Sequence, residues 1–194
     1  MQWQWGSPAF QRFSRWMFVS TFMASCQNVL STDAMLTLLS VMSEQRTFNY
    51  IGKDVVGQLS SLAVMMGFTK HIDANPRHFM GQSLLLHQTS MTILLVSPTV
   101  PAYFLPLAGF GNMLSNVAFM GFGGINAKCI QALATDNNVG ELYSKLTITQ
   151  TLASSLGLTA GVALSTLPAT EVWFTALGLG NMLCYYKAVT NVLK

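Results

Sequence analysis

Residues 78–127 read HFMGQSLLLHQTSMTILLVSPTVPAYFLPLAGFGNMLSNVAFMGFGGINA, a run of fifty residues without Lys, Arg, Asp or Glu. A domain that folds in water needs charged side chains on its exposed faces, so a gap of this length is unusual for a water-solvated surface. The run is long enough for two membrane crossings of about 20 residues each, joined at the break that contains Pro98 and Pro101. We therefore predict that this part of the chain lies in lipid.

The composition of the whole chain agrees with this prediction. Of its 194 residues, 51% are hydrophobic and 9% are charged, whereas ordinary soluble domains carry about 25% charged residues. The net charge of +3 is small and dispersed, which disfavours a nucleic-acid surface. Cys26, Cys129 and Cys184 are widely separated and form no CxxC pair, so we expect neither a disulfide scaffold nor a zinc site.

Six apolar stretches lie between breaks that contain Pro, Asp or Asn. They are Trp16–Leu39, Tyr50–Phe68, Phe79–Val96, Tyr103–Phe122, Leu142–Ser165 and Val172–Tyr186. We predict an all-α, polytopic transmembrane bundle of about six helices. In this interpretation residues 1–15 form a short interfacial segment, and residues 16–194 form a single helical membrane domain. No small-residue cleavage site follows the first stretch, so we interpret it as a retained helix rather than a signal peptide.

The basic residues provide an independent test of six crossings. An even number of crossings puts both termini on the same side, together with the second and fourth connections. That side holds Arg12, Arg15, Lys70, Arg77, Lys128, Lys145, Lys187 and Lys194, and the opposite side holds Arg46 and Lys53. Because Lys and Arg stay on the cytoplasm-like side, we predict that both termini face the matrix, stroma or cytosol.

Small residues indicate where helices approach closely. Gly157 and Gly161 are spaced four apart within an apolar segment, and Gly178 adds a small face to the last stretch. Such glycines let two backbones pack against each other in lipid. We favour packing within the chain over a homodimer contact.

Five polar residues fall within predicted crossings and are candidates for a buried polar site: Asp54, Gln58, His87, Asn112 and Asn116. Asp54 and Gln58 are one helical turn apart, so their side chains could share a hydrogen bond. His87 lies near the middle of the third predicted crossing, where an ionisable residue normally faces the bundle interior. We favour a neutral His87 with a hydrogen bond inside the bundle. Axial ligation of a tetrapyrrole or proton handling is the functional alternative.

Other charged residues favour structural roles. Glu141 and Lys145 have the i,i+4 spacing of a helical ion pair. Lys70 and Arg77 lie in the second connection, where they could contact anionic lipid headgroups. Nearby His71 and His78 show no metal-binding spacing. We find no catalytic triad, nucleophile elbow, metal cluster or dinucleotide loop, and we predict no catalytic residues and no required cofactor.

Several motifs in order resemble the membrane core of the RUS (root UVB sensitive) family. Val29–Leu36 (VLSTDAML) is similar to the family's VLSTQALL, and Lys53–Leu59 (KDVVGQL) is similar to KDGLGQL. Ile72–Arg77 (IDANPR), Phe104–Ala108 (FLPLA) and Asn138–Lys145 (NVGELYSK) resemble three further family segments. Asp33 and Glu141 depart from the pattern. The resemblance implies an organellar setting and a link to vitamin B6 balance, and it carries no catalytic residues over.

These observations together predict a non-catalytic accessory protein of an organellar membrane, in a plastid or the mitochondrial inner membrane. Its expected partners are membrane lipids and other transmembrane subunits, with bound lipid and no nucleic acid. The alternative is a transporter or binder of a small metabolite related to vitamin B6. That alternative needs Asp54, His87, Asn112 and Asn116 to converge on one cavity.

Overall fold

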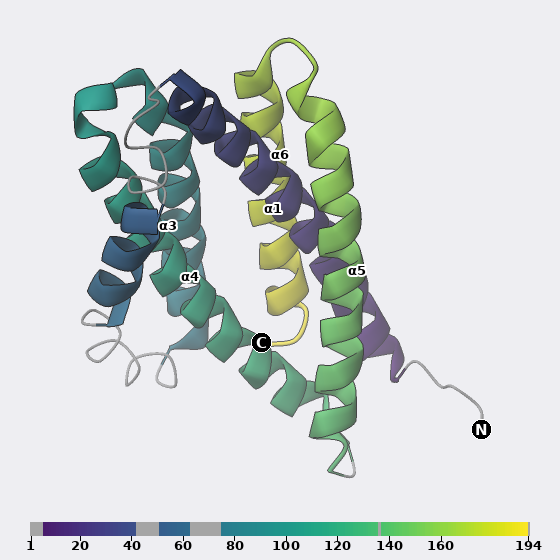
Figure 1. Ribbon diagram of the computed structural model, residues 1–194. Coiled ribbons are helices and arrows are strands. Elements are labelled where there is room, and N and C mark those ends of the chain that lie inside the picture. Colours follow the sequence, from purple (N-terminus) through teal and green to yellow (C-terminus); the bar gives the residue numbers. More distant parts are fainter. Residues whose placement is uncertain (1–5, 42–50, 63–74, 136, 194) are drawn as a thin grey trace. The chain divides into compact units, whose positions relative to one another are not determined.

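The computed structural model describes residues 6–41, 51–62, 75–135 and 137–193, and every regular element in these ranges is helical. Residues 51–62 form one helix, drawn in blue in Figure 1. The other elements are α1 (Pro8–Val41), α3 (Pro76–Val96), η1 (Ser97–Thr99), η2 (Pro101–Tyr103), α4 (Phe104–Leu133), α5 (Val139–Ser165) and α6 (Thr170–Thr190). The all-α prediction is confirmed.

Each predicted apolar stretch falls on a helix in the part of the chain that is described. Of the second stretch, only residues 51–62 are described. The predicted break at Pro98 and Pro101 is also present, since two short 3-10 turns separate α3 from α4. A proline supplies no backbone N–H, which favours the start of a helix over its interior.

Among these described helices, none combines the length and the apolar character that a membrane crossing requires. The predicted six crossings are therefore unconfirmed. One physical reason is visible in α1, where Ser14, Ser20 and Gln27 are buried polar residues that interrupt the apolar sequence.

The first helix begins earlier than predicted. α1 starts at Pro8 rather than near Trp16, so residues 8–15 lie on the same helix as the first apolar stretch. Ser7 Oγ accepts a hydrogen bond from the Phe10 backbone N–H at 3.2 Å. A serine cap followed by proline at the first helical position is a standard start signal, and it moves the predicted boundary by two helical turns.

The contacts divide the chain into two compact units. Unit 1 comprises residues 1–27 and 123–194, and unit 2 comprises residues 28–122. Unit 1 therefore contains the first part of α1, the end of α4, and all of α5 and α6. Unit 2 contains the rest of α1, the 51–62 helix, α3 and the first part of α4. The predicted boundary at residue 15 lies inside α1, in unit 1.

Unit 1 is held together by helices that exchange polar as well as apolar contacts. α5 and α6 follow one another through a short turn at residues 166–169 and lie antiparallel (Figure 1). α1 packs on both: Ser25 Oγ donates to Ser154 Oγ of α5 at 3.0 Å, and Ser20 Oγ donates to Asn181 Oδ1 of α6 at 2.7 Å. The fully buried Phe10 and Phe13 anchor the start of α1 in the apolar core.

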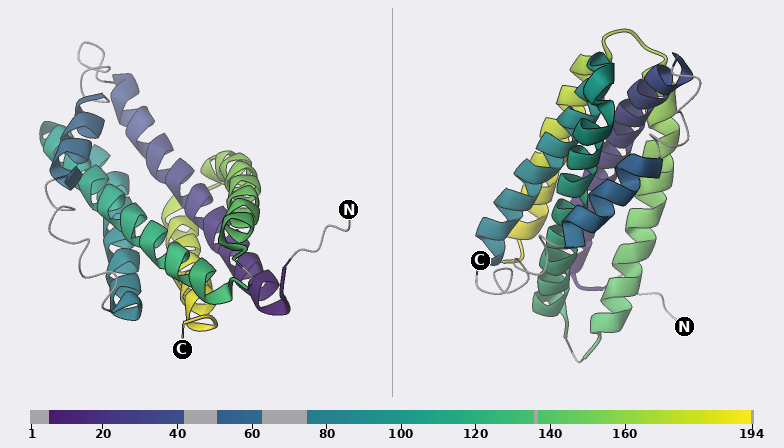
Figure 2. Two further views of the ribbon diagram at one scale, coloured as in Figure 1. Left: turned by 90° about the horizontal axis from the view of Figure 1, so that it is seen from below. Right: turned by 60° about the vertical axis from the view of Figure 1, so that its left-hand side comes forward.

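Unit 2 brings the 51–62 helix against α4, as Figure 2 shows in its right-hand view. A Cβ atom at Gly109 would lie only 2.9 Å from Val56 Cγ1, so the two helices meet where α4 has no side chain. α3 contacts α4 as well, because Ser90 Oγ donates to the Gly111 carbonyl oxygen at 2.6 Å.

Candidate functional site

In unit 2, a polar cluster joins the 51–62 helix to α4. Asp54 Oδ1 accepts a hydrogen bond from Asn112 Nδ2 at 3.0 Å and an ion-paired hydrogen bond from Lys53 Nζ at 2.6 Å. The Lys53 side chain is 8% exposed and that of Asp54 is 42% exposed, so a buried ammonium group reaches a carboxylate at the surface. Burying a charge is costly unless a partner compensates it, and Asp54 is such a partner.

Within the described residues, the hydrogen-bond partners of Asp54 are not on its own helix face. Gln58 is exposed, and Asp54 pairs with Lys53 and Asn112 instead. The reason is tertiary: Gly57 lies against Asn112, whose Cβ would be 2.7 Å from a Cβ atom at position 57. The missing side chain at Gly57 lets the Asn112 amide approach Asp54. Asn116, one turn further along α4, is half-buried and donates no side-chain hydrogen bond to the described residues.

His87 lies in an aromatic environment in unit 2. Its ring is 2% exposed and packs against Phe119 and Phe122, with ring centroids at 5.4 and 5.8 Å. Neither ring nitrogen has a hydrogen-bond partner among the described residues. Desolvation by burial lowers the pKa of His87 from 6.5 to about 4. His87 is therefore neutral at pH 7, but the predicted hydrogen bond inside the bundle is absent from the described residues.

This packing has a consequence for the predicted polar site. Asp54 and Asn112 are brought together, whereas His87 has no hydrogen bond to either of them. A tetrapyrrole at His87 stays a prediction, which an absorption spectrum of the purified protein tests.

The glycine positions pack within the chain. In α5, Gly157 and Gly161 are buried, as is Gly178 in α6. A Cβ atom at Gly157 would lie 2.4 Å from the backbone carbonyl oxygen of Phe22, so α1 and α5 touch backbone to backbone. Cys26 Sγ also donates to the Gly157 carbonyl oxygen at 3.1 Å. At Gly157 the close approach is thus an intrachain one.

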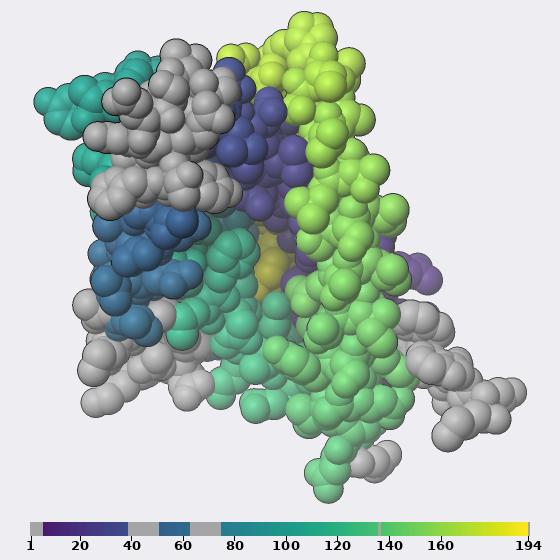
Figure 3. Space-filling model, in the orientation of Figure 1, coloured from purple at the N-terminus to yellow at the C-terminus, as the bar shows by residue number. Residues whose placement is uncertain are grey.

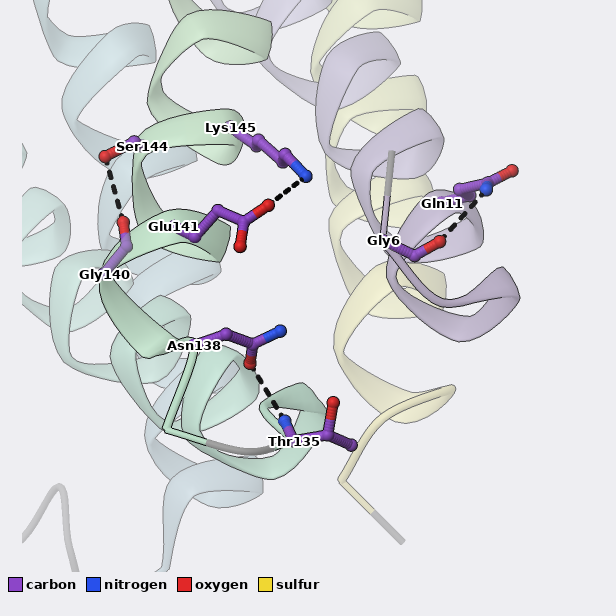
Figure 4. Close-up of polar contacts among 8 residues, drawn as sticks. All are labelled: Gly6, Gln11, Thr135, Asn138, Gly140, Glu141, Ser144 and Lys145. Carbon is purple, nitrogen blue, oxygen red and sulfur yellow. Dashed lines mark hydrogen bonds and ion pairs between the residues drawn. The ribbon is translucent and has the colours of Figure 1, made fainter. Parts of the chain in front are cut away.

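The predicted ion pair at the start of α5 is present. Lys145 Nζ donates to Glu141 Oε1 at 2.5 Å, as Figure 4 shows. The Lys145 side chain is 9% exposed and that of Glu141 is 60% exposed. Asn138 stands before the helix, where its Oδ1 accepts from the Thr135 backbone N–H at 2.9 Å (Figure 4). The Glu141–Lys145 pair stabilises the first turns of α5, where an acidic residue also suits the helix dipole.

The second connection is only partly described. Arg77 is exposed in the first turn of α3, and His78 beside it is exposed too. Lys70, His71 and Asp73 lie outside the described residues. Within the described ranges, no group of three His, Cys, Asp or Glu residues is arranged to hold a metal ion.

Sequence reasoning missed a cavity in unit 1. It has a volume of about 730 Å³ and lies between the start of α1 and the middle of α5. Its lining residues are Phe10, Gln11, Ser14, Arg15, Phe18, Val19, Thr149 and Leu152. A volume of this size is within the range of small-molecule sites. The start signal at Ser7 and Pro8 could have indicated this wall of the cavity, because it places residues 10–19 on one helix.

The comparison with known protein families covers almost the whole chain. A family model described as a vitamin B6 photo-protection and homoeostasis domain matches residues 6–193. The motifs that resemble the family contain both ion pairs described above, Lys53–Asp54 and Glu141–Lys145.

Three proteins of Arabidopsis thaliana are similar to this chain. Root UVB sensitive 4 is 26% identical over 160 residues, which cover 80% of this chain and 31% of that protein. Root UVB sensitive 3 is 22% identical over 193 residues (94% of this chain, 44% of that protein). Root UVB sensitive 2, chloroplastic, is 22% identical over 162 residues (82% and 37%). The chain spans less than half the length of these relatives. No solved structure matches it.

Proposed function

The chain belongs to the root UVB sensitive family, and from this premise we propose that it is a lipid-contacting accessory protein of an organellar membrane. The family match confirms the resemblance found in its motifs. The observation that carries the proposal is the surface of the α5–α6 pair, which exposes rows of apolar residues and has a single charged residue between residues 146 and 186.

The exposed face of α6 carries an unbroken apolar stripe. Its members are Val172, Ala176, Leu179, Leu183 and Tyr186. Leu179 is 59% exposed and Leu183 is 62% exposed. Spacings of three and four residues put all five on one face of the helix, over about 21 Å at a rise of 1.5 Å per residue. A contiguous apolar face of this length marks contact with lipid or with another protein.

α5, drawn in green in Figure 3, also exposes an apolar row, which runs beside an exposed row of serine and threonine residues. Ile148, Leu152 and Leu156 follow one another at four-residue spacing, and each is about half exposed. Residues 146–186 contain no Lys or Arg, and Glu171 is their single charged residue. Water-facing helices normally carry charges on this side.

Three exposed basic residues of unit 1 lie toward the end opposite the 166–169 turn. The start of α1, the start of α5 and the end of α6 lie at this end (Figure 1). They carry the exposed Arg12, Arg15 and Lys187, whereas Lys145 at the same end is buried and paired with Glu141. Lys187 Nζ lies 5.0 Å from the Trp16 ring centroid. An apolar pair of helices with a basic end and an interfacial tryptophan matches the polarity of a membrane surface with anionic headgroups.

The interior of unit 1 fits the same role. The helices are joined by serine, asparagine and glycine contacts, such as Ser20 with Asn181 and Gly157 with Phe22. Close approach at small residues and hydrogen bonds between helices are the contacts that hold helices together where lipid surrounds them. An organellar location is supported by a relative whose name includes the word chloroplastic.

Membrane fractionation of the expressed protein tests this proposal. We expect the chain to remain in the pellet after alkaline carbonate washing and to migrate with larger partners after mild detergent extraction. Replacing Leu179 and Leu183 by glutamate should release it to the supernatant. The matched control replaces Ser144 and Thr147, which are exposed polar residues of α5, by glutamate as well. This control should leave the protein in the pellet. Recovery of the unaltered chain in the carbonate supernatant as a lone monomer contradicts the proposal.

A second candidate function is the binding or transport of a small metabolite related to vitamin B6. The description of the matching family model names this vitamin, and the Lys53–Asp54–Asn112 cluster supplies polar groups from two helices. Titration of the purified protein with pyridoxal 5′-phosphate, compared with an Asp54→Asn variant, tests binding, and uptake into reconstituted liposomes tests transport. Equal heat signals for both proteins and uptake no greater than that of empty liposomes exclude this candidate.

A further inference from the structure

We propose that the cavity between α1 and α5 binds a single-chain amphiphile with an anionic head, such as a fatty acid carboxylate. This inference rests on the proposed contact with lipid and deepens it by naming a site and a ligand class. The cavity has a volume of about 730 Å³ and belongs entirely to unit 1.

The shape of the cavity favours an elongated ligand. Its α1 wall runs from Phe10 to Val19, which corresponds to about 13 Å along a helix with a rise of 1.5 Å per residue. Phe10 and Ser14 are buried and form its floor, whereas Arg15 and Leu152 are exposed and lie at its mouth. A site that extends along a helix and has mostly apolar walls suits a hydrocarbon chain better than a compact polar ring.

The neutral polar side chains in the wall already form hydrogen bonds within the chain, and Arg15 is the exception. Ser14 Oγ donates to Thr149 Oγ1 at 3.2 Å, and Thr149 Oγ1 donates to the Lys145 carbonyl oxygen at 2.9 Å. Gln11 Nε2 donates to the Gly6 carbonyl oxygen at 3.2 Å (Figure 4). Within the described residues, Arg15 forms no ion pair with a carboxylate, and it is the single charged residue that lines the cavity.

A guanidinium group at the mouth of an apolar cavity is complementary to an anionic head with an apolar tail. Its planar set of N–H donors binds a carboxylate or a phosphate in a bidentate manner. The neutral hydroxyl and amide groups in the same wall cannot supply this charge. The charge of Arg15 therefore determines the sign of the ligand's head.

The direction of the ligand follows from the polarity of unit 1. Arg15 lies toward the basic end, and Phe18 and Val19 lie about one turn further from it along α1. On α5, Leu152 lies further from that end than Thr149. Leu152 is also part of the exposed apolar row with Ile148 and Leu156. The apolar end of the cavity is thus continuous with the surface that we propose to face lipid, so a chain can enter from the membrane side.

The test is binding of oleate to delipidated protein, measured by native mass spectrometry of the intact chain in a non-ionic detergent. We expect one oleate per chain. Arg15→Gln should weaken this binding about tenfold or more, which is the effect of losing one charge-assisted hydrogen bond. Arg12→Gln is the matched control: Arg12 is exposed on the same helix, three residues away, and does not line the cavity. Its affinity for oleate should be unchanged.

Three further ligands distinguish the contribution of the charged head to the affinity from that of the hydrocarbon chain. Oleyl alcohol has the same chain without the charge, and it should bind Arg15→Gln and the unaltered protein equally weakly. Acetate and pyridoxal 5′-phosphate carry the charge without the chain, and they should not displace oleate. Val19→Phe fills the apolar part of the cavity and should weaken oleate binding while the guanidinium stays in place.

The proposal is overturned by three results. These are no bound oleate, an equal loss of affinity in the Arg12 and Arg15 variants, or displacement of oleate by pyridoxal 5′-phosphate at a similar concentration. Failure of this inference is distinct from failure of the proposed function. A chain that pellets with membranes but binds no oleate refutes only the cavity site, whereas a chain that does not pellet refutes the membrane role itself.

Discussion

The contact between α1 and α5 at Gly157 provides the sharpest test of the packing. A Cβ atom at this position would lie 2.4 Å from the Phe22 carbonyl oxygen and 2.8 Å from Ser25 Cβ. Ordinary contacts between carbon and a carbonyl oxygen are about 3.3 Å or longer. Gly157→Ala therefore requires the two helices to separate by roughly 1 Å, because a backbone oxygen cannot rotate away as a side chain can.

Two opposing terms set the magnitude of this change. Overpacking a close contact costs about 1–3 kcal/mol, and replacing a mid-helix glycine by alanine favours the helix by about 1 kcal/mol. Because the 2.4 Å contact is with a backbone oxygen, the upper part of the overpacking range, about 2–3 kcal/mol, applies. We therefore expect a net loss of about 1–2 kcal/mol in the free energy of unfolding. For a chain of this size each kcal/mol corresponds to about 2–4 °C in Tm, so Gly157→Ala should lower Tm by about 2–8 °C.

The assay is thermal unfolding in a mild detergent, followed by far-ultraviolet circular dichroism. Gly81→Ala is the matched control, since Gly81 lies inside α3 and a Cβ atom there would meet nothing within 4 Å. This variant has only the helix-propensity term and should raise Tm by about 2–4 °C. If Gly157→Ala raises Tm as much as Gly81→Ala does, the close backbone contact between α1 and α5 does not exist.

Three further predictions concern buried polar groups. The pKa of His87 is about 4 in the folded protein and 6.5 for an ordinary histidine. The unfolded chain therefore takes up this proton first, and the free energy of unfolding should fall by about 3 kcal/mol as the pH drops from about 6.5 to about 4. His87→Phe should reduce that loss in urea unfolding at a series of pH values, and an unchanged pH profile contradicts the burial of His87. Asp54→Ala removes the carboxylate that Lys53 Nζ contacts at 2.6 Å, and it should lower the free energy of unfolding by about 2–4 kcal/mol. The double variant Lys53→Met/Asp54→Leu should recover most of this loss, because no buried charge remains. No recovery in the double variant argues against a buried lysine. Asn181→Leu removes the acceptor of the buried Ser20 hydrogen bond and should cost about 1–3 kcal/mol, because the Ser20 hydroxyl is left unsatisfied. The Ser20→Ala/Asn181→Leu double variant should cost less than the sum of the two single variants, and strictly additive losses contradict the bond.

Local sequence patterns predicted the helices well. The apolar stretches and their proline breaks located six helical segments in the described ranges, because the preference for helix and the position of a break depend on residues close in sequence. The same locality made the Glu141–Lys145 pair predictable, since both residues lie one turn apart on one helix. The start of α1 is also encoded locally, by Ser7 and Pro8, but it was not predicted because residues 8–15 precede the apolar run.

The polar site was predicted less well, because its partners come from different helices. The spacing of Asp54 and Gln58 allowed a hydrogen bond between them, but α4 brings Asn112 to Asp54. His87 was expected to have a hydrogen bond in the interior, but α4 surrounds it with Phe119 and Phe122. Neither outcome follows from spacing within one helix.

By itself, the sequence determined that this chain is helical, poor in charge and related to the root UVB sensitive family. These properties depend on composition and on patterns within a few turns. Only the tertiary structure decided that Gly157 meets the Phe22 backbone, that Asp54 meets Asn112, and that Arg15 borders a cavity with α5. The physical reason is that contacts between helices depend on how side chains from distant segments fill the same space, and no local pattern records which segments those are.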